Sequence, residues 1–162
     1  MTRRRTARRA ELVAALDREG RRTGSIGSLH ARALADRAGV HPTDFEALDV
    51  LDWAGAISAG ELAKRVGVTS GAITGVIDRL ERDGWVRRVG DPADRRKVIV
   101  EMVPERVAAT EQMDVFGPLI TDIATITERF DDDQLAAILD YLRACNDAVE
   151  RSTARLRAAP RA

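Results

Sequence analysis

Residues 58–103 read SAGELAKRVGVTSGAITGVIDRLERDGWVRRVGDPADRRKVIVEMV, and this stretch decides the fold. Ser58 and Glu61 have the spacing of a capping box, which predicts a short helix that Gly67 closes. A second helix is predicted from residue 69 or 70 to residue 82, because its apolar residues recur at the spacing of one buried helical face. Those apolar residues are Ile73, Val76, Ile77 and Leu80. The two predicted helices have the spacing of a helix-turn-helix.

Two β-branched segments follow the helix pair, residues 85–89 and 97–102, and they are predicted to pair as a hairpin. Asp91 and Pro92 suit the first two positions of a type I turn between them. The predicted fold class is therefore mostly α-helical, with a small β-hairpin directly after a helix-turn-helix.

The tip of this hairpin is rich in charge. It carries Arg95, Arg96 and Lys97, and Asp91 and Asp94 are close enough in sequence to orient the guanidinium groups through charge-assisted hydrogen bonds. An arginine held in this way fits a narrow minor groove of DNA. For the loop alone, a solvated charged turn is the simpler interpretation. Directly after a helix-turn-helix, the same loop favours a unit that reads DNA.

The composition bounds the remaining possibilities. The chain has 162 residues, 44% of them apolar, which is enough for a packed core in one domain or two small lobes. No run of eighteen apolar residues occurs and the first ten residues are rich in arginine, so we expect a cytoplasmic protein without a membrane segment. The single cysteine, Cys145, cannot form an internal disulfide, and His30 and His41 cannot complete a zinc site alone. We expect no metal and no other cofactor.

Charge is distributed unevenly, although the net charge is zero. Residues 1–40 carry ten basic and four acidic groups, and residues 69–100 carry seven and five. Residues 41–68 carry two basic and five acidic groups, and residues 101–162 carry seven and twelve, so the C-terminal third would repel phosphate. We expect any contact with nucleic acid on residues 1–40 or 69–100. The arginine-rich start is equally consistent with a solvated tail.

Two helices are predicted before the helix-turn-helix. The first is interrupted near residues 23–24 and ends at Gly39, and its apolar stripe begins with Leu12, Val13 and Leu16. The second starts at the capping box of residues 43–46, just after Pro42, and ends before Gly55. Its predicted buried face consists of Phe45, Ala47, Leu48 and Leu51.

Two further helices are predicted in the C-terminal third. One opens at Pro104 and is kinked at Gly117 and Pro118, and the other starts at the acidic run 131–133, where carboxylates complement the helix dipole. The last helix carries an apolar stripe formed by Leu135, Ile138, Leu139, Leu142, Cys145 and Val149. This stripe belongs either to the core of one chain or to a dimer. We favour the dimer, because one small lobe needs less apolar surface than the terminal helices offer.

Four motifs stand in order along the chain: PTDFEALDVL at residues 42–51, GELA at 60–63, SGAITGVIDRLE at 70–81 and DPADRR at 91–96. Together they resemble the winged helix-turn-helix core of the MarR (multiple antibiotic resistance regulator) family. Outside this core the similarity is one of helix layout. The resemblance implies a homodimer that binds pseudo-palindromic promoter DNA, with repression as its default action. It divides the chain into supporting helices at 1–40, the DNA-binding core at 41–103 and dimerisation helices at 104–162.

The resemblance also implies roles for individual residues. By position, it places the helix of residues 70–82 in the major groove and the wing of residues 87–100 in the minor groove. Ser70, Thr74 and Arg79 become candidate DNA contacts on the helix.

In the wing, the resemblance makes Arg96 the residue that enters the minor groove. Asp94 would brace it, and Arg95 could replace or assist it at a phosphate. The exposed face of the recognition helix has no Asn, Gln or Lys, and Gly71 and Gly75 stand where longer side chains could read a base. We therefore expect few base contacts, about one to three per half-site, and a large share of shape readout through Arg96 at an A·T-rich flank.

Members of this family often bind small aromatic or amphipathic effectors between the dimerisation helices and the winged core. The residues that could line such a pocket here are His30, Trp53 and Phe116, together with His41. Ordinary packing or a surface position is the simpler interpretation of each. Some relatives sense peroxide through a reactive thiol, whereas the place of Cys145 on an apolar stripe favours an inert buried cysteine.

Other classes of protein fit the sequence less well. An enzyme is not expected, because the chain has no nucleophile elbow, phosphate loop or HExxH motif. A winged helix that binds other proteins, or an architectural protein that binds DNA without sequence preference, stays open as an alternative. The retained Arg79, Arg95 and Arg96 argue against the protein-binding module. The operator, the effector and the choice between repression and activation cannot be read from the sequence.

Overall fold

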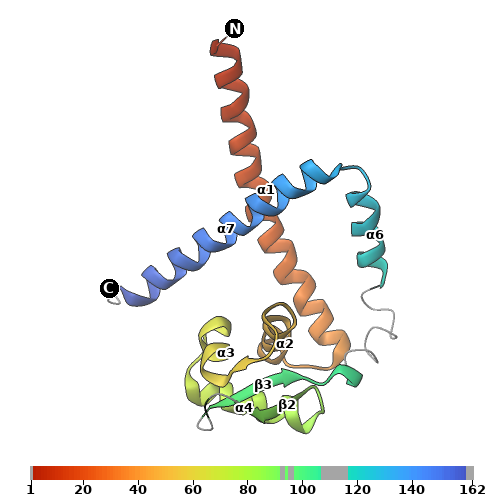
Figure 1. The fold of residues 1–162 in the computed structure, drawn as a ribbon, viewed down its shortest axis with the longest axis vertical. Helices are drawn as coiled ribbons and strands as arrows, with labels where there is room; N and C mark the ends of the chain where they lie inside the picture. Colours follow the sequence, from red (N-terminus) through yellow and green to blue (C-terminus); the bar gives the residue numbers. More distant parts are fainter. Residues whose placement is uncertain (1, 92–93, 95–96, 107–116, 160–162) are drawn as a thin grey trace. The chain divides into compact units, whose positions relative to one another are not determined.

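The structure is a computed structural model that describes residues 2–91, 94, 97–106 and 117–159. The chain divides into two compact units, Met1–Gln112 and Met113–Ala162, and each is described by itself. The described part is mostly helical with one small antiparallel sheet, which confirms the predicted fold class (Figure 1). Among the described residues, no helix combines the length and the apolar character needed to cross a membrane.

Helix α1 (Thr2–Ala38) is continuous, so the predicted interruption at residues 23–24 is wrong. Glycine lowers helix propensity by about 1 kcal/mol but does not force a turn when its backbone keeps helical angles. Ser25 and Ser28 donate hydrogen bonds to the carbonyl oxygens four residues earlier, at 3.2 and 3.0 Å, and this satisfies their hydroxyls within the helix. The predicted end at Gly39 is confirmed, since this glycine has a φ of 66°.

Helix α2 (Pro42–Ala54) begins before the capping box predicted at residues 43–46, so that prediction is wrong. The N-cap is His41, whose Nδ1 accepts a hydrogen bond from the backbone N–H of Thr43 at 3.2 Å. Proline is favoured at the first helical position, because its fixed φ suits a helix and its missing N–H would be unpaired there. The predicted end of the helix before Gly55 is confirmed.

The buried face of α2 includes a carboxylate. Asp44 is 4% exposed and lies in line with the buried Ala47, Leu48 and Leu51, whereas Phe45, predicted to be buried, is only half-buried. The prediction failed at this end of the helix because the face is set by the neighbouring helix α4, which supplies a cation for Asp44.

The outer face of α2 carries an acidic pair, Asp49 and Asp52. Partial desolvation, and secondly the charge of Asp52, raise the pKa of Asp49 above its ordinary value. The folded chain therefore holds the Asp49 proton more tightly than the unfolded chain, and stability falls as the pH rises from about 4 through the raised pKa.

We expect Asp49→Asn to remove this loss. The free energy of unfolding should rise by about 0.2–0.5 kcal/mol at pH 7 and should not rise at pH 3, where Asp49 is already protonated. Urea unfolding of the wild type and the variant at both pH values measures the difference. An equal gain at pH 3 would show that the charge is not the cause.

Helices α3 (Ala59–Val66) and α4 (Ser70–Arg82) form the predicted helix-turn-helix. Their N-caps, Ser58 and Thr69, each accept a hydrogen bond from the backbone N–H three residues later, at 3.2 Å. Gly67 closes α3 with a φ of 85°, a left-handed conformation that glycine adopts without a steric penalty. The four residues predicted to be buried on α4 are buried: Ile73, Val76, Ile77 and Leu80.

Strands β2 (Val86–Gly90) and β3 (Val98–Met102) form the predicted hairpin, with Arg88 opposite Val100. A third strand, β1 (Ile57–Ser58), pairs with the other edge of β3, giving the order β1-β3-β2. This strand was not predicted, because two residues are too few to show an alternating pattern.

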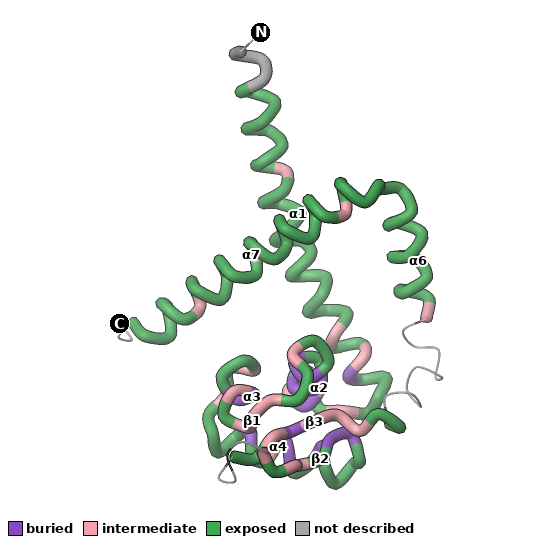
Figure 2. The backbone as a smooth tube through the Cα atoms, viewed as in Figure 1, coloured by how far each residue is buried: buried purple, intermediate pink, exposed green. Residues whose placement is uncertain are grey.

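The core of the first unit lies among α2, α3, α4 and the sheet (Figure 2). Ala35 of helix α1 is also completely buried, and α1 contacts α2. The largest fully buried side chains are Leu62, Ile73, Ile77, Leu80, Val86 and Val100. Both α4 and the base of the hairpin contribute side chains to this core, so the two elements pack against each other there.

The second unit contains α6 (Gly117–Thr127) and α7 (Asp132–Ala158). Asp131 and Gln134 form a capping box at the start of α7, with reciprocal hydrogen bonds of 2.8 and 3.0 Å, so the predicted helix start at the acidic run is confirmed. Residues 107–116 lie outside the described part of the chain, and the predicted kink at the edge of that segment stays a prediction.

The apolar stripe of α7 is not covered within its own unit (Figure 2). Leu139 and Leu142 are 46% and 51% exposed, and Leu135 and Cys145 are half-buried. The stripe predicted on α1 is similarly open, with Leu12 55%, Val13 54% and Leu16 49% exposed. Neither stripe forms part of the buried core of its own unit.

Candidate nucleic-acid interface

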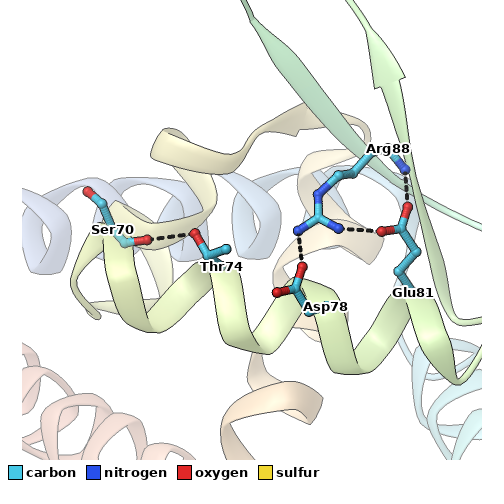
Figure 3. Close-up of polar contacts among 5 residues, drawn as sticks. All are labelled: Ser70, Thr74, Asp78, Glu81 and Arg88. Carbon is cyan, nitrogen blue, oxygen red and sulfur yellow. Dashed lines mark hydrogen bonds and ion pairs between the residues drawn. The ribbon is translucent and has the colours of Figure 1, made fainter.

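The exposed face of α4 is small and polar. Ser70, Gly71, Thr74 and Asp78 are exposed, while Gly75 is half-buried. Ser70 and Thr74 lie one turn apart, and the Thr74 hydroxyl donates to the Ser70 carbonyl oxygen at 3.0 Å (Figure 3). This bond uses the proton of Thr74 Oγ1 and leaves its lone pairs as acceptors. The face therefore permits close approach of a flat or convex partner and offers few groups for hydrogen bonding.

Arg79 has a partner that sequence reasoning missed. Its Nε donates to Asp44 Oδ2 at 2.8 Å, and its Nη2 donates to Asp44 Oδ1 at 2.5 Å, a two-point ion pair between α4 and α2. The Arg79 side chain is 42% exposed, whereas the Asp44 side chain is 6% exposed. The hydrogen bond to Asp44 is the main reason why the pKa of Arg79 is raised above its ordinary value.

A signal for this pair was present in the sequence. Asp44 stands at the i position of an i, i+3, i+4, i+7 apolar pattern with Ala47, Leu48 and Leu51, and a carboxylate on a buried stripe requires a cation nearby. The pattern identifies the acid, but its partner lies 35 residues away on another helix. Sequence alone could not select Arg79 among the arginines of the chain.

Arg88 of β2 joins the hairpin to α4 (Figure 3). Its Nη2 donates to Asp78 Oδ1 at 2.6 Å, its Nη1 donates to Glu81 Oε2, and its backbone N–H donates to Glu81 Oε1 at 3.1 Å. The hydrogen bond to Asp78, the largest effect, and the contact with Glu81 raise the pKa of Arg88 above its ordinary value. No sequence pattern pointed to this cluster.

The described part of the hairpin end is held by its acidic residues. The backbone N–H of Asp94 donates to Asp91 Oδ1 at 3.3 Å, and the N–H of Lys97 donates to the Asp94 carbonyl oxygen at 2.8 Å. Lys97 Nζ lies 3.9 Å from Asp94 Oδ2. Arg95 and Arg96 lie outside the described residues, so their predicted contacts with DNA, and the bracing of Arg96 by Asp94, stay predictions.

The proposed effector residues lie on different elements. His30 is exposed on α1, and Trp53 is 57% exposed on α2, with the Arg65 guanidinium 4.9 Å from its ring centroid. His41 caps α2, and Phe116 lies outside the described residues. The effector pocket stays a prediction. Cys145 is half-buried in the single chain, less covered than the sequence suggested.

A helix-turn-helix followed by a hairpin on one core, with an exposed polar helix face beside the hairpin, defines a winged-helix protein of the class that regulates transcription. The MarR family model matches residues 40–98. The uncharacterized HTH-type transcriptional regulator YcgE of Bacillus subtilis is 34% identical over 137 residues, covering 85% of this chain and 88% of the relative. The chain belongs to the MarR family of transcriptional regulators, as the sequence motifs predicted.

Solved structures agree with this assignment. Transcriptional regulator Tm0710 from Thermotoga maritima has a TM-score of 0.56 and 28% identity, covering 86% of this chain and 96% of its own. A mutant MarR from E. coli, complexed with operator DNA, has a TM-score of 0.50 and 25% identity, covering 80% of this chain and 92% of its own. Both alignments reach well beyond the winged core.

Proposed function

We propose that this protein is a homodimeric repressor that binds a pseudo-palindromic operator and is released by a small-molecule effector. In this proposal α4 enters the major groove and the wing of residues 87–100 enters the adjacent minor groove. The observation that carries it is the exposed face of α4, lined by Ser70, Gly71 and Thr74, on the same rigid core as the hairpin. The mutant MarR from E. coli was solved in complex with operator DNA, which supports operator DNA as the partner of this chain.

We propose individual contacts with DNA on α4 and on the wing. Ser70, at the N-terminus of α4, and Thr74, one turn later, are proposed to meet base edges or phosphates, because recognition helices read DNA with their N-terminal residues. Arg79 uses Nε and Nη2 on Asp44, so we propose that it reaches a phosphate only through its remaining donors. In the wing, Arg96 is proposed for the minor groove, Arg95 for a neighbouring phosphate and Asp94 as the brace.

The exposed apolar stripes of α1 and α7 are the basis for the proposed dimer. We propose that residues 1–40 and 104–162 supply the dimerisation helices, and that α7 and the α1 stripe bury their apolar faces against a second copy. A two-fold dimer would place its recognition helices about 34–36 Å apart, one turn of DNA. An effector that binds more tightly to dimers with a different separation between the recognition helices would reduce the population of dimers able to bind DNA. His30, Trp53 and Phe116 are the proposed pocket residues.

The proposal is tested by selection of randomised and genomic duplexes with the purified full-length protein, sequenced at two salt concentrations. An enriched inverted repeat with half-sites one turn apart is the expected result, with affinity that falls steeply as salt rises. Binding without an enriched sequence would instead indicate an architectural protein. The absence of binding at low salt would indicate a protein-interaction module. A reporter fused to the enriched promoter then separates repression from activation.

We expect Arg96→Ala to weaken binding to the selected operator by about tenfold and to reduce the preference for an A·T-rich flank, because a narrow minor groove attracts arginine. Titrations against operators with A·T-rich and G·C-rich flanks measure both effects. Arg151→Ala, which removes one exposed positive charge from α7, is the matched control and should leave the flank preference unchanged. Unaltered affinity and flank preference in Arg96→Ala would rule out shape readout by this residue.

A further inference from the structure

We propose that Arg88 is a positioning residue that fixes the hairpin against the recognition helix, so that both elements meet DNA at one set spacing. The proposal rests on the proposed function and adds a specificity role for residues outside the expected contacts. We call this cluster the α4–β2 clamp; it consists of Arg88, Asp78 and Glu81. The clamp acts through geometry and does not itself need to touch a base.

The clamp joins two elements at three points. Two oxygens of Glu81 accept from Arg88, one from its backbone N–H at 3.1 Å and one from its side chain, and Asp78 Oδ1 accepts from Nη2 at 2.6 Å. The Arg88 side chain is only 30% exposed. Charge-assisted hydrogen bonds with two partners in a planar fork fix direction as well as distance. The clamp therefore restrains both the main chain and the side chain of β2.

Without the clamp, fewer contacts would hold the hairpin to α4. The turn after α4 is closed by the Trp85 N–H, which donates to the Leu80 carbonyl oxygen at 2.8 Å, and Val86 is buried in the core. Arg88 lies two residues after Val86, between the base of the hairpin and its tip, and its side chain contacts α4. Small rotations of the hairpin about its base become larger displacements at its end, so a restraint at this level sets where the wing reaches.

The charge of the clamp gives the proposal a distinctive consequence. Asp78 is 59% exposed on the polar face of α4, and a carboxylate beside DNA repels phosphate. If Asp78 and Glu81 acted only through charge, Asp78→Asn and Glu81→Gln would strengthen DNA binding. If they hold Arg88 in place, the same variants weaken specific binding. The two interpretations predict opposite signs.

The neighbouring residue offers a matched control. Arg87 lies on the opposite side of the same strand, where its Nε donates to Glu101 Oε1 at 2.6 Å. Its side chain is 56% exposed. Arg87→Met and Arg88→Met therefore each remove one positive charge from β2. Arg87→Met breaks one ion pair, with Glu101, whereas Arg88→Met breaks two, with Asp78 and Glu81, and these two connect the hairpin to α4.

The experiment uses full-length variants and two sets of duplexes: the selected operator, and the same operator with one base pair inserted between the segments for α4 and the wing. One base pair adds about 3.4 Å. We expect Arg88→Met to lose about tenfold in affinity for the selected operator and to lose most of the wild-type preference for the uninserted spacing. Arg87→Met should lose about threefold or less and keep the spacing preference.

Arg88→Lys, Asp78→Asn and Glu81→Gln complete the set. Lysine keeps the charge but cannot bridge both carboxylates with a planar fork, so it should also relax the spacing preference. Equal behaviour of Arg88→Met and Arg87→Met, or tighter specific binding by Asp78→Asn and Glu81→Gln, would overturn the clamp. Thermal unfolding identifies any variant that fails to fold, and in that case the lysine and amide variants decide. If the wild type selects no duplex, the proposed function fails. If the wild type selects a duplex but no variant alters its preference for the spacing, only the clamp fails.

Discussion

Arg79→Met is expected to lower the free energy of unfolding by about 2–3 kcal/mol. The reason is Asp44, which is 4% exposed and accepts two hydrogen bonds from the Arg79 guanidinium. Methionine retains much of the length of the side chain but leaves this carboxylate without its cation. Removing one partner of a fully buried pair costs about 3–5 kcal/mol. We expect less here because Arg79 is partly solvated, with 42% of its side chain exposed.

Arg82→Met is the matched control. Arg82 lies three residues after Arg79 on the same helix, and its Nε pairs at 3.0 Å with the adjacent, exposed Asp83. Exposed pairs of this kind contribute little to stability, because water and salt screen the two charges. Urea unfolding of both variants and of the double variant Asp44→Asn, Arg79→Met measures the effect, and the double variant should be more stable than Arg79→Met alone. Equal stability of the Arg79 and Arg82 variants would mean that the buried carboxylate does not need its partner.

The winged core could be predicted from the sequence because its signals are local. Ser58 and Thr69 cap helices through backbone groups three residues away, and Gly67 closes a helix through its own φ angle. The apolar spacing on α4 depends only on the period of a helix. Such features are decided within a few residues, and all of them are present in the structure.

The errors lie where distant contacts or marginal energies decide. The break predicted in α1 treated glycine as a stop, whereas α1 continues to Ala38 and ends at Gly39, the position with positive φ. The N-cap of α2 is His41 and not Thr43, as the predicted capping box implied, because Pro42 can start a helix as readily as a capping box can. Strand β1 exists only because β3 pairs with it, so its two residues carry no pattern of their own.

In the candidate site too, features decided by local sequence could be predicted, and contacts between distant residues could not. Ser70 and Thr74 could be assigned to the exposed face of α4 from helical periodicity alone, and the structure has both exposed. The partners of Arg79 and Arg88 could not be assigned, since each ion pair joins elements that are adjacent only after folding. Charge counts identify a basic segment, but geometry decides which of its arginines are committed to carboxylates of the same chain.

The paired substitution Leu139→Asp, Leu142→Asp is expected to dissociate the proposed homodimer, raising its dissociation constant by at least about a thousandfold. These two leucines are 46% and 51% exposed on the apolar stripe of α7. Full burial of an exposed leucine contributes about 1.5–3 kcal/mol. Because these two side chains are already about half covered, each would contribute about half of this value, and a dimer would lose that contribution four times. Each aspartate would also have to be desolvated or neutralised. Sedimentation equilibrium across a range of protein concentrations measures the dissociation constant.

Ala144→Asp provides the control, because residue 144 lies on the opposite side of α7 from the stripe and is exposed. It adds the same charge to the same helix and should leave the dimer intact. Operator binding should weaken in the paired variant and not in the control, since two linked half-site contacts bind more tightly than two independent ones. The circular dichroism of both variants should match that of the wild type, because the new charges are exposed in the single chain and should leave the helices intact. A paired variant that sediments as a dimer would move the interface away from α7, and the open stripe of α1, with Leu12, Val13 and Leu16, would then be the next surface to substitute.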